Sequence, residues 1–121
     1  MQMLAKLSVL LVALLHFGFL TLEMFFWDDP VGREIFSLTA QQSAQTAVLA
    51  ANQGLYNGFL AAGLLWGLFA GKRDVTFFFL ICVVVAGVFG AATASPTILF
   101  VQALPALLAM VFLFLARRKA L

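Results

Sequence analysis

Charged residues are scarce in this chain of 121 residues, where seven Lys and Arg and five Asp and Glu make up only 10% of the total. Hydrophobic residues make up 64%. Soluble domains are typically about one quarter charged, so a water-exposed surface cannot be built from this composition. The sequence therefore excludes a soluble or secreted globular domain and predicts an integral membrane protein.

Cysteine and histidine are nearly absent as well, with one residue of each, Cys82 and His16. A single cysteine excludes an intrachain disulfide, a CxxC redox pair and a cysteine-rich metal site. Glu23 lies seven residues from His16, or about 10 Å along a helix, which is too far for both to bind one ion. No serine or cysteine has a base partner placed by spacing. We expect no metal and no cofactor.

Four apolar runs are long enough to cross about 30 Å of hydrocarbon, which takes about 20 helical residues. They cover residues 7–27, 47–70, 75–94 and 98–116. The sequence thus predicts an all-α fold, a four-helix transmembrane bundle that forms one domain over 1–121. The first run is too long for a secretory signal and contains Glu23. Thr39 followed by Gln42 has the spacing of a capping box, so the second helix is expected to begin before it enters the membrane.

The basic residues predict the orientation of the bundle, because cytoplasmic ends of membrane helices are enriched in Lys and Arg. Only Arg33 falls on the opposite side from the other basic residues, which are Lys6, Lys72, Arg73, Arg117, Arg118 and Lys119. Both termini are therefore expected in the cytoplasm, and the chain in the bacterial inner membrane as a multi-pass protein. The basic residues form no patch with interleaved aromatic residues, so no nucleic-acid partner is expected.

Small residues recur four apart on the second helix, at Gly54 and Gly58 and again at Gly63 and Gly67. Such spacing lets membrane helices approach closely. We interpret it as packing within the bundle, with a homo-oligomer through these faces as the alternative. Pro105 is expected to bend the fourth helix.

Seven polar residues lie inside the predicted spans, all in the outer half or at the midplane: His16, Glu23, Asn52, Gln53, Tyr56, Asn57 and Gln102. A carboxylate at membrane depth costs roughly 2.5–3.5 kcal/mol, so it usually faces a partner or water. Counting about 1.5 Å per residue places Glu23 level with Asn52 and Gln102, and His16 level with Asn57 and Tyr56. A polar cavity in the outer half of the bundle follows.

The predicted cavity indicates a protein that binds or converts a small molecule. Glu23 and His16 are the candidate catalytic residues, and Asn52, Gln53, Tyr56, Asn57 and Gln102 are the candidate ligand-binding residues. The expected ligand is lipophilic or small and polar, in a protein that also contacts membrane lipid. A plainer interpretation is that the amides and the imidazole only join helices through hydrogen bonds. Whether the chain is an enzyme stays open.

Four strings of the sequence carry a resemblance that covers nearly the whole chain: HFGFLTLEMFFWDDP, AANQGLYNGFLAAGLLWG, VVVAGVFGAATAS and FVQALPALLA. They resemble the small bacterial membrane-protein family DUF1304, a domain of unknown function. The resemblance implies a four-helix integral membrane protein and brings no activity, substrate or catalytic residue. The architecture is also loosely similar to DoxX-like membrane proteins.

Two other functions remain open from the sequence. One is a small proton-coupled transporter, because four helices with a glutamate in the first are similar in plan to small multidrug-resistance exporters. The chain departs from that plan, since Glu23 lies near the outer surface and the charge bias is strong. The other is an assembly or structural subunit of a membrane complex, held by the glycine-rich helix faces.

Overall fold

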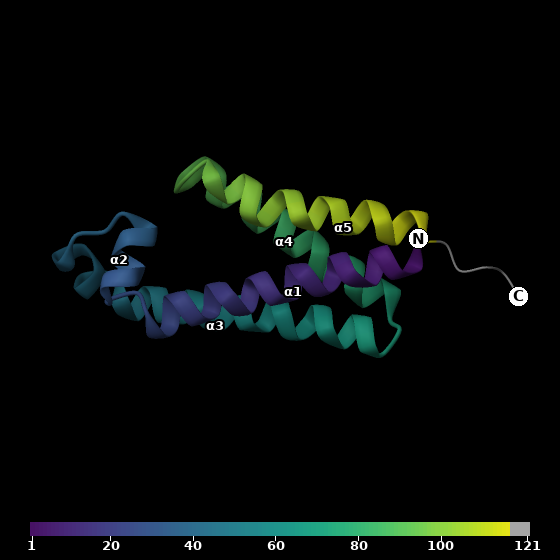
Figure 1. Cartoon of the computed structure of the whole chain (residues 1–121), viewed down its shortest axis with the longest axis horizontal. Helices are drawn as coiled ribbons and strands as arrows, with labels where there is room; N and C mark the ends of the chain where they lie inside the picture. The colour runs from purple at the N-terminus through teal and green to yellow at the C-terminus, as the bar shows by residue number, and fades with distance from the viewer. Residues whose placement is uncertain (117–121) are drawn as a thin grey trace, which may run out of the picture.

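The computed structural model describes residues 1–116, which form helices and no strands. Figure 1 shows the elements in chain order: α1 (Gln2–Phe25), α2 (Pro30–Phe36), α3 (Ala40–Phe69), α4 (Arg73–Thr93), the π-helical turn η1 (Leu99–Ala103) and α5 (Leu104–Leu115). The predicted all-α fold is confirmed. Three basic residues used for the orientation, Arg117, Arg118 and Lys119, lie outside the described residues.

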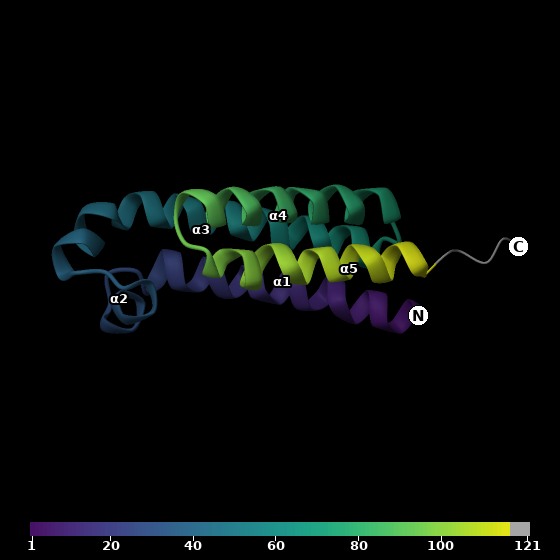
Figure 2. The same cartoon turned by 90° about the horizontal axis from the view of Figure 1, so that it is seen from above.

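The long helices α1, α3 and α4 lie side by side with the continuous helical segment formed by η1 and α5, and α2 lies at one end of them (Figures 1 and 2). Helix α1 packs against α3 and α5, while α4 packs against α3, η1 and α5. The N-terminus and the end of α5 lie together at the end opposite α2. Helices α1, α3, α4 and α5 share one core of fully buried aliphatic side chains: Val9, Val12, Ala13, Leu64, Leu80, Val83, Ala106 and Ala109.

The capping box predicted before the second long helix is confirmed. The Thr39 hydroxyl accepts from the Gln42 amide N–H at 3.1 Å, and the Gln42 side chain accepts from the Thr39 N–H at 3.0 Å. Both bonds satisfy donors that a helix start leaves unpaired. Helix α3 therefore begins at Ala40 and runs for 30 residues, so its first two turns precede the predicted span of 47–70.

The short helix α2 was not predicted from the sequence. The Asp29 side chain accepts from the Val31 amide at 3.2 Å, and Pro30 occupies the first turn. An aspartate cap followed by proline is a common helix start. Ser37, in the left-handed region with φ 54°, ends the helix after seven residues.

The π-helical turn η1 lies just before Pro105, the residue at which the sequence predicts a bend. Proline has no amide hydrogen, so it cannot donate to the carbonyl four residues earlier. Just before it, the Leu104 amide donates to the Leu99 carbonyl, five residues back instead of four. This wider turn carries Gln102 toward the interior of the bundle, and such π-bulges are often found at functional sites.

Glycines on α3 and α4 allow close contacts with neighbouring helices of the same chain. A Cβ at Gly54 would meet Met24 and Glu23, and one at Gly67 would meet the backbone of Thr76. At Gly87 it would lie 2.6 Å from the Ala103 amide nitrogen. These faces are already occupied by neighbouring helices, which supports the interpretation of packing within the bundle.

Two helices, α1 and α4, are long and apolar enough to cross a membrane. The apolar stretch Leu99–Leu115 is shorter. Much of the outer surface is hydrophobic, including Leu11 and Leu14 on α1, Val85 and Val88 on α4, and Leu108 on α5.

Candidate functional site

A cavity of about 470 Å³ lies at the α2 end of the bundle, between α1, α3, α4 and η1. Its apolar and small wall residues are Phe19, Phe36, Leu60, Ala86, Phe89, Gly90, Ala94, Ile98 and Val101. Its polar wall residues are Glu23, Gln53, Tyr56, Asn57, Thr93 and Gln102. Five of the seven residues singled out from the sequence therefore line one cavity. Cavities that hold small molecules are typically about 300–1,000 Å³ and mostly apolar with a few polar groups.

The Glu23 carboxyl group, on α1, is joined to α3 through Asn57. The Asn57 amide nitrogen donates to both carboxyl oxygens, at 3.2 and 3.1 Å. Asn57 is 6% exposed, whereas Glu23 is only half-buried. One amide donor leaves most of the acceptor positions of a carboxylate unused. Glu23 is thus oriented from one side and can accept from a ligand on the other.

His16 lies behind the cavity wall and joins α1 to η1. Its ring is fully buried, and its Nδ1 is 2.8 Å from the Val12 carbonyl oxygen. Because a carbonyl oxygen only accepts, Nδ1 carries the hydrogen. Nε2 is then free to accept from the Gln102 amide nitrogen at 3.1 Å. His16 is therefore a positioning residue for Gln102 in this arrangement, and its predicted catalytic role stays a prediction.

The polar pairs differ from those expected by counting along the helices. Glu23 is hydrogen-bonded to Asn57, whereas the count placed it level with Asn52. Gln102 is hydrogen-bonded to His16, whereas the count placed it level with Glu23. Side chains tilt toward the N-terminus of their own helix. In the antiparallel pair α1 and α3, Glu23 therefore leans away from the α2 end and Asn57 leans toward it, so the two side chains meet. Figure 1 also shows α3 extending well past the ends of α4 and η1, an axial offset that the count did not include.

The remaining predicted residues divide into two groups. Gln53 and Tyr56 line the cavity, and the Tyr56 ring packs edge-on against Phe59 with centroids 5.8 Å apart. Asn52 is exposed, is not part of the wall, and donates from its side chain to the Val48 carbonyl of its own helix at 3.0 Å. The structure thus brings all the candidate ligand-binding residues except Asn52 to the cavity.

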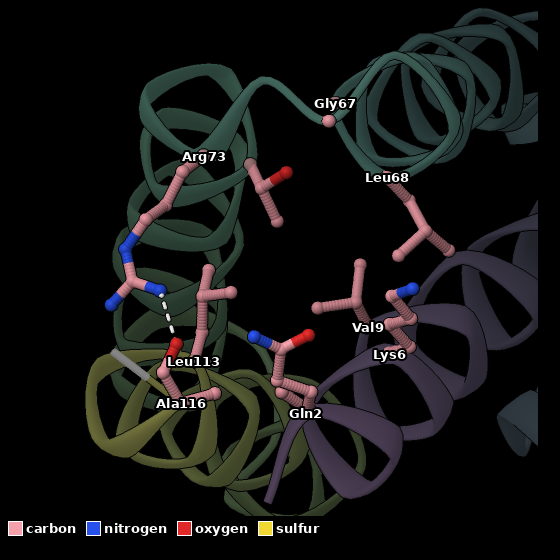
Figure 3. A pocket seen from close by; sticks show the side chains of 11 residues that line it. Gln2, Lys6, Val9, Gly67, Leu68, Arg73, Leu113 and Ala116 are labelled. Atoms are coloured by element: carbon pink, nitrogen blue, oxygen red, sulfur yellow. Dashed lines mark hydrogen bonds between the residues drawn. The ribbon is translucent and has the colours of Figure 1, made fainter. Parts of the chain in front are cut away.

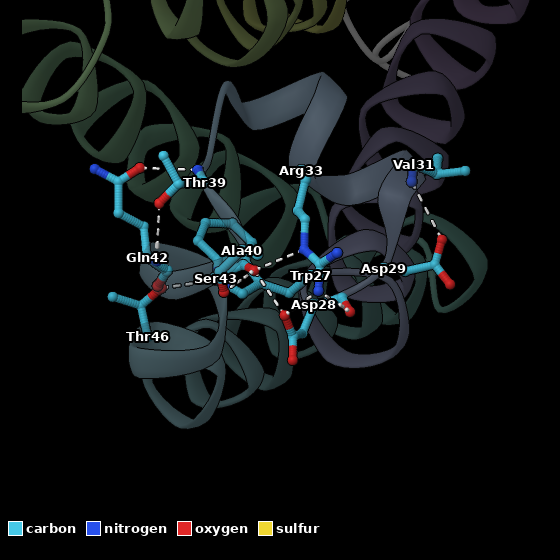
Figure 4. A network of polar contacts seen from close by, with 10 residues as sticks. All are labelled: Trp27, Asp28, Asp29, Val31, Arg33, Thr39, Ala40, Gln42, Ser43 and Thr46. Carbon is cyan, nitrogen blue, oxygen red and sulfur yellow. Dashed lines mark hydrogen bonds and ion pairs between the residues drawn. The ribbon is translucent and has the colours of Figure 1, made fainter.

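A polar network closes the α2 end of the bundle (Figure 4). Asp28 Oδ1 accepts from the Ser43 hydroxyl at 2.6 Å and from the Arg33 guanidinium at 2.8 Å. Arg33 Nε donates to the same Ser43 oxygen at 3.0 Å. The hydrogen bond from Ser43, followed by that from Arg33, holds the pKa of the Asp28 carboxyl group below its ordinary value.

This network also fixes an aromatic part of the cavity wall. The Trp27 indole donates to the Thr46 hydroxyl at 2.9 Å, and its ring packs on Phe36 with centroids 4.7 Å apart. Phe36 in turn lines the cavity from α2. Sequence reasoning missed Phe36, Arg33 and Ser43 as parts of the site, and the Asp29-Pro30 helix start was the available signal for α2.

Metal-ligating side chains are not clustered in the described part of the chain. Residues 1–116 contain no group of three or more His, Cys, Asp or Glu side chains that could hold an ion. Cys82 is a half-buried free thiol on α4 and does not line the cavity.

Comparison with known proteins identifies the family. A family model described as a protein of unknown function, DUF1304, matches residues 10–114. The chain belongs to the DUF1304 family. This DUF1304 chain is also similar to a curated relative, the uncharacterized protein YpaA of Lactococcus lactis subsp. lactis strain IL1403, with 28% identity over 118 residues. The alignment covers 94% of the chain and 99% of the relative. No solved structure matches, so the DoxX-like architecture stays a prediction.

Proposed function

We propose that this DUF1304 chain is a multi-pass protein of the bacterial cytoplasmic membrane whose outer cavity binds a lipophilic molecule that carries a hydrogen-bond donor, such as an amine or a hydroxyl. Glu23 is the recognising group. Asn57, Gln53, Tyr56 and Gln102 are the other polar contacts.

The membrane arrangement is a four-helix transmembrane bundle with both termini in the cytoplasm. Two features support it: the long apolar helices α1 and α4, and the hydrophobic outer faces of the bundle. The charges at the two ends support the orientation, because Lys6 near the start of α1 and Lys72 and Arg73 at the start of α4 belong to helix ends that lie opposite α2. The one basic residue at the α2 end, Arg33, is paired with Asp28.

The chemistry of the wall supports the ligand class. Among the fifteen wall residues there is one carboxyl group and no Lys, Arg or His. The half-buried Glu23 therefore has no cation beside it in the wall, and an ammonium or hydroxyl group of a ligand can supply the missing donor. The aromatic rings of Phe19, Phe36 and Phe89 favour a ligand with an apolar body.

The observation that carries the proposal is the one-sided orientation of Glu23 by Asn57. A carboxylate whose only role was to join two helices would be costly at this depth, and a neutral amide would serve as well. A ligand that donates to the free side of the carboxyl group explains why an acid is present.

Binding of three probes with the same apolar chain tests the proposal. Dodecylamine, dodecanol and dodecanoate are titrated against the purified protein in lipid nanodiscs, with wild type compared with Glu23→Gln. Hydrogen bonds to charged groups are worth about 1.5–3 kcal/mol, so we expect Glu23→Gln to weaken dodecylamine binding about tenfold or more. Dodecanoate should bind weakly to both forms, because it has no donor at neutral pH.

Two controls make this test specific. The amide introduced by Glu23→Gln keeps an oxygen that can accept from Asn57, so the fold is expected to persist. Asn52→Ala removes a polar side chain from the same helix as Asn57 but outside the cavity, and it should leave binding unchanged. Equal binding of all three probes to wild type and Glu23→Gln would refute the proposal. Loss of a partner protein rather than of the probe would point to the assembly role, and proton-coupled flux in liposomes would point to transport.

A further inference from the structure

A second hollow, of about 240 Å³, lies at the opposite end of the bundle from the outer cavity. It is an open hollow bordered by the first turns of α1 and α4 and the last turns of α3 and α5. Figure 3 shows the side chains of Lys6 and Arg73 on opposite sides of it, with the Gln2 amide between them. Its inner wall is apolar, with Val9, Leu68 and Leu113.

The wall of this hollow carries the basic side chains of Lys6 and Arg73 and no acidic side chain. None of its eleven wall residues is Asp or Glu, and Asp74, in the first turn of α4, is not among them. The Lys6 side chain makes no hydrogen bond or ion pair with the described residues 1–116. The guanidinium of Arg73 donates to the Ala116 carbonyl at 3.0 Å and to Phe114 at 3.3 Å, which uses two of its five N–H groups.

The helix ends at this hollow also favour an anion. Helices α1 and α4 both begin here, and neither has a side-chain cap on its first amides. The opposite charge of the helix C-termini is satisfied locally, because Arg73 covers the end of α5 and the Lys72 amide donates to the Gly67 carbonyl at the end of α3. Uncapped helix N-termini attract negative groups.

An apolar groove continues from this hollow. This groove, of about 330 Å³, shares Lys6 and Leu68 with the hollow and is otherwise lined by Leu7, Leu10 and Phe69. Leu7 is 55% exposed and Phe69 is 78% exposed, so the groove opens on the outer surface of the bundle. Lys6 thus lies between a polar hollow and an apolar groove.

We infer that this end of the bundle is a binding site for an anionic phospholipid. The phosphate lies in the hollow against Lys6, Arg73 and the Gln2 amide, and an acyl chain lies in the groove along Leu7 and Leu10. Basic pockets between membrane helices on the cytoplasmic side commonly bind acidic headgroups. The site is separate from the outer cavity and does not depend on what that cavity binds.

Native mass spectrometry with defined lipids tests this site. The purified protein is mixed with equal amounts of phosphatidylglycerol and phosphatidylcholine that carry the same acyl chains, and the bound lipid is counted for wild type, Lys6→Gln and Lys72→Gln. Lys72 lies at the same end, with its ammonium 5.2 Å from the Trp66 ring centre, and does not line the hollow. It is therefore a control with the same change of charge.

We expect wild type and Lys72→Gln to retain phosphatidylglycerol preferentially, and Lys6→Gln to retain about fivefold less, as for the loss of one basic contact at a lipid surface. Equal loss in both variants would mean diffuse attraction to the basic end and would overturn the site. Displacement of the lipid by inorganic phosphate at millimolar concentration would show that the groove contributes nothing, and would overturn the lipid as the occupant. Thermal unfolding of each variant shows whether the fold is retained, and Lys6 is exposed, so Lys6→Gln should unfold as wild type does.

Discussion

The close approach of α4 and η1 at Gly87 can be tested by adding one methyl group. A Cβ at this position would lie 2.6 Å from the Ala103 amide nitrogen and 2.9 Å from its Cα. Both are backbone atoms, so no flexible side chain can move aside. Overpacking of this kind costs about 1–3 kcal/mol. Gly87→Ala should therefore separate η1 from α4 and destabilise the bundle.

Gly18 provides the matched control, since it is also a helical glycine but nothing lies within 4 Å of a Cβ built there. Both substitutions gain the same helix propensity, about 1 kcal/mol for Gly to Ala. The difference between the two variants thus isolates the steric cost. Relative to wild type, we expect Gly18→Ala to be slightly stabilised and Gly87→Ala to be destabilised, with a gap of about 1–3 kcal/mol.

Unfolding by sodium dodecyl sulfate in mixed micelles measures this gap for both variants under one condition. Because η1 carries Gln102, Gly87→Ala should also weaken binding in the outer cavity, whereas Gly18→Ala should not. Equal stability of the two variants would refute the close packing of α4 on η1 and, with it, the placement of Gln102 against His16.

Two further predictions concern the polar contacts. Gln102→Leu leaves the buried Nε2 of His16 without its donor and should cost about 1–3 kcal/mol of unfolding free energy; an unchanged unfolding curve would show that the bond is absent. The lowered pKa of Asp28 means that the contribution of this carboxyl group to stability is complete above its ordinary pKa of 3.8 and is lost as the pH falls through the lowered pKa. Fluorescence of Trp27, measured in a Trp66→Phe background from pH 7 to pH 2, should therefore change at acidic pH, and Asp28→Asn should already show the altered signal at pH 7.

The parts of the fold that depend on local chemistry could be predicted from the sequence. The apolar composition and runs predicted the all-α fold, and the Thr39-Gln42 spacing predicted the capping box at the start of α3. The helix α2 was missed because only seven residues form it, too few for hydrophobic periodicity to register. The π-helical turn η1 was missed because the missing amide of Pro105 indicates a bend and does not specify a wider turn before it.

The candidate site was predictable in composition but not in pairing. The positions of Glu23, Asn57 and Gln102 inside the predicted spans marked them as site residues, because burial of polar groups is costly wherever they lie. Which of them meet depends on the axial offset between helices and on the tilt of each side chain, and neither is encoded in a residue count. Asn52 shows the same limit, since its outward direction follows from the rotation of α3 and places it outside the cavity.

The separation of charge between the two ends of the bundle has an electrical consequence. In the described residues, Lys6, Lys72 and Arg73 lie at one end together with one acidic residue, Asp74, while Asp29 and Glu34 lie at the other end and Arg33 is neutralised by Asp28. In a cell whose interior is negative, moving one positive charge outward against 100 mV requires about 2.3 kcal/mol. In the proposed orientation, with the basic end inside, the resting potential would itself help to hold the bundle in place, so we expect an energised membrane to favour this orientation more strongly than a depolarised one.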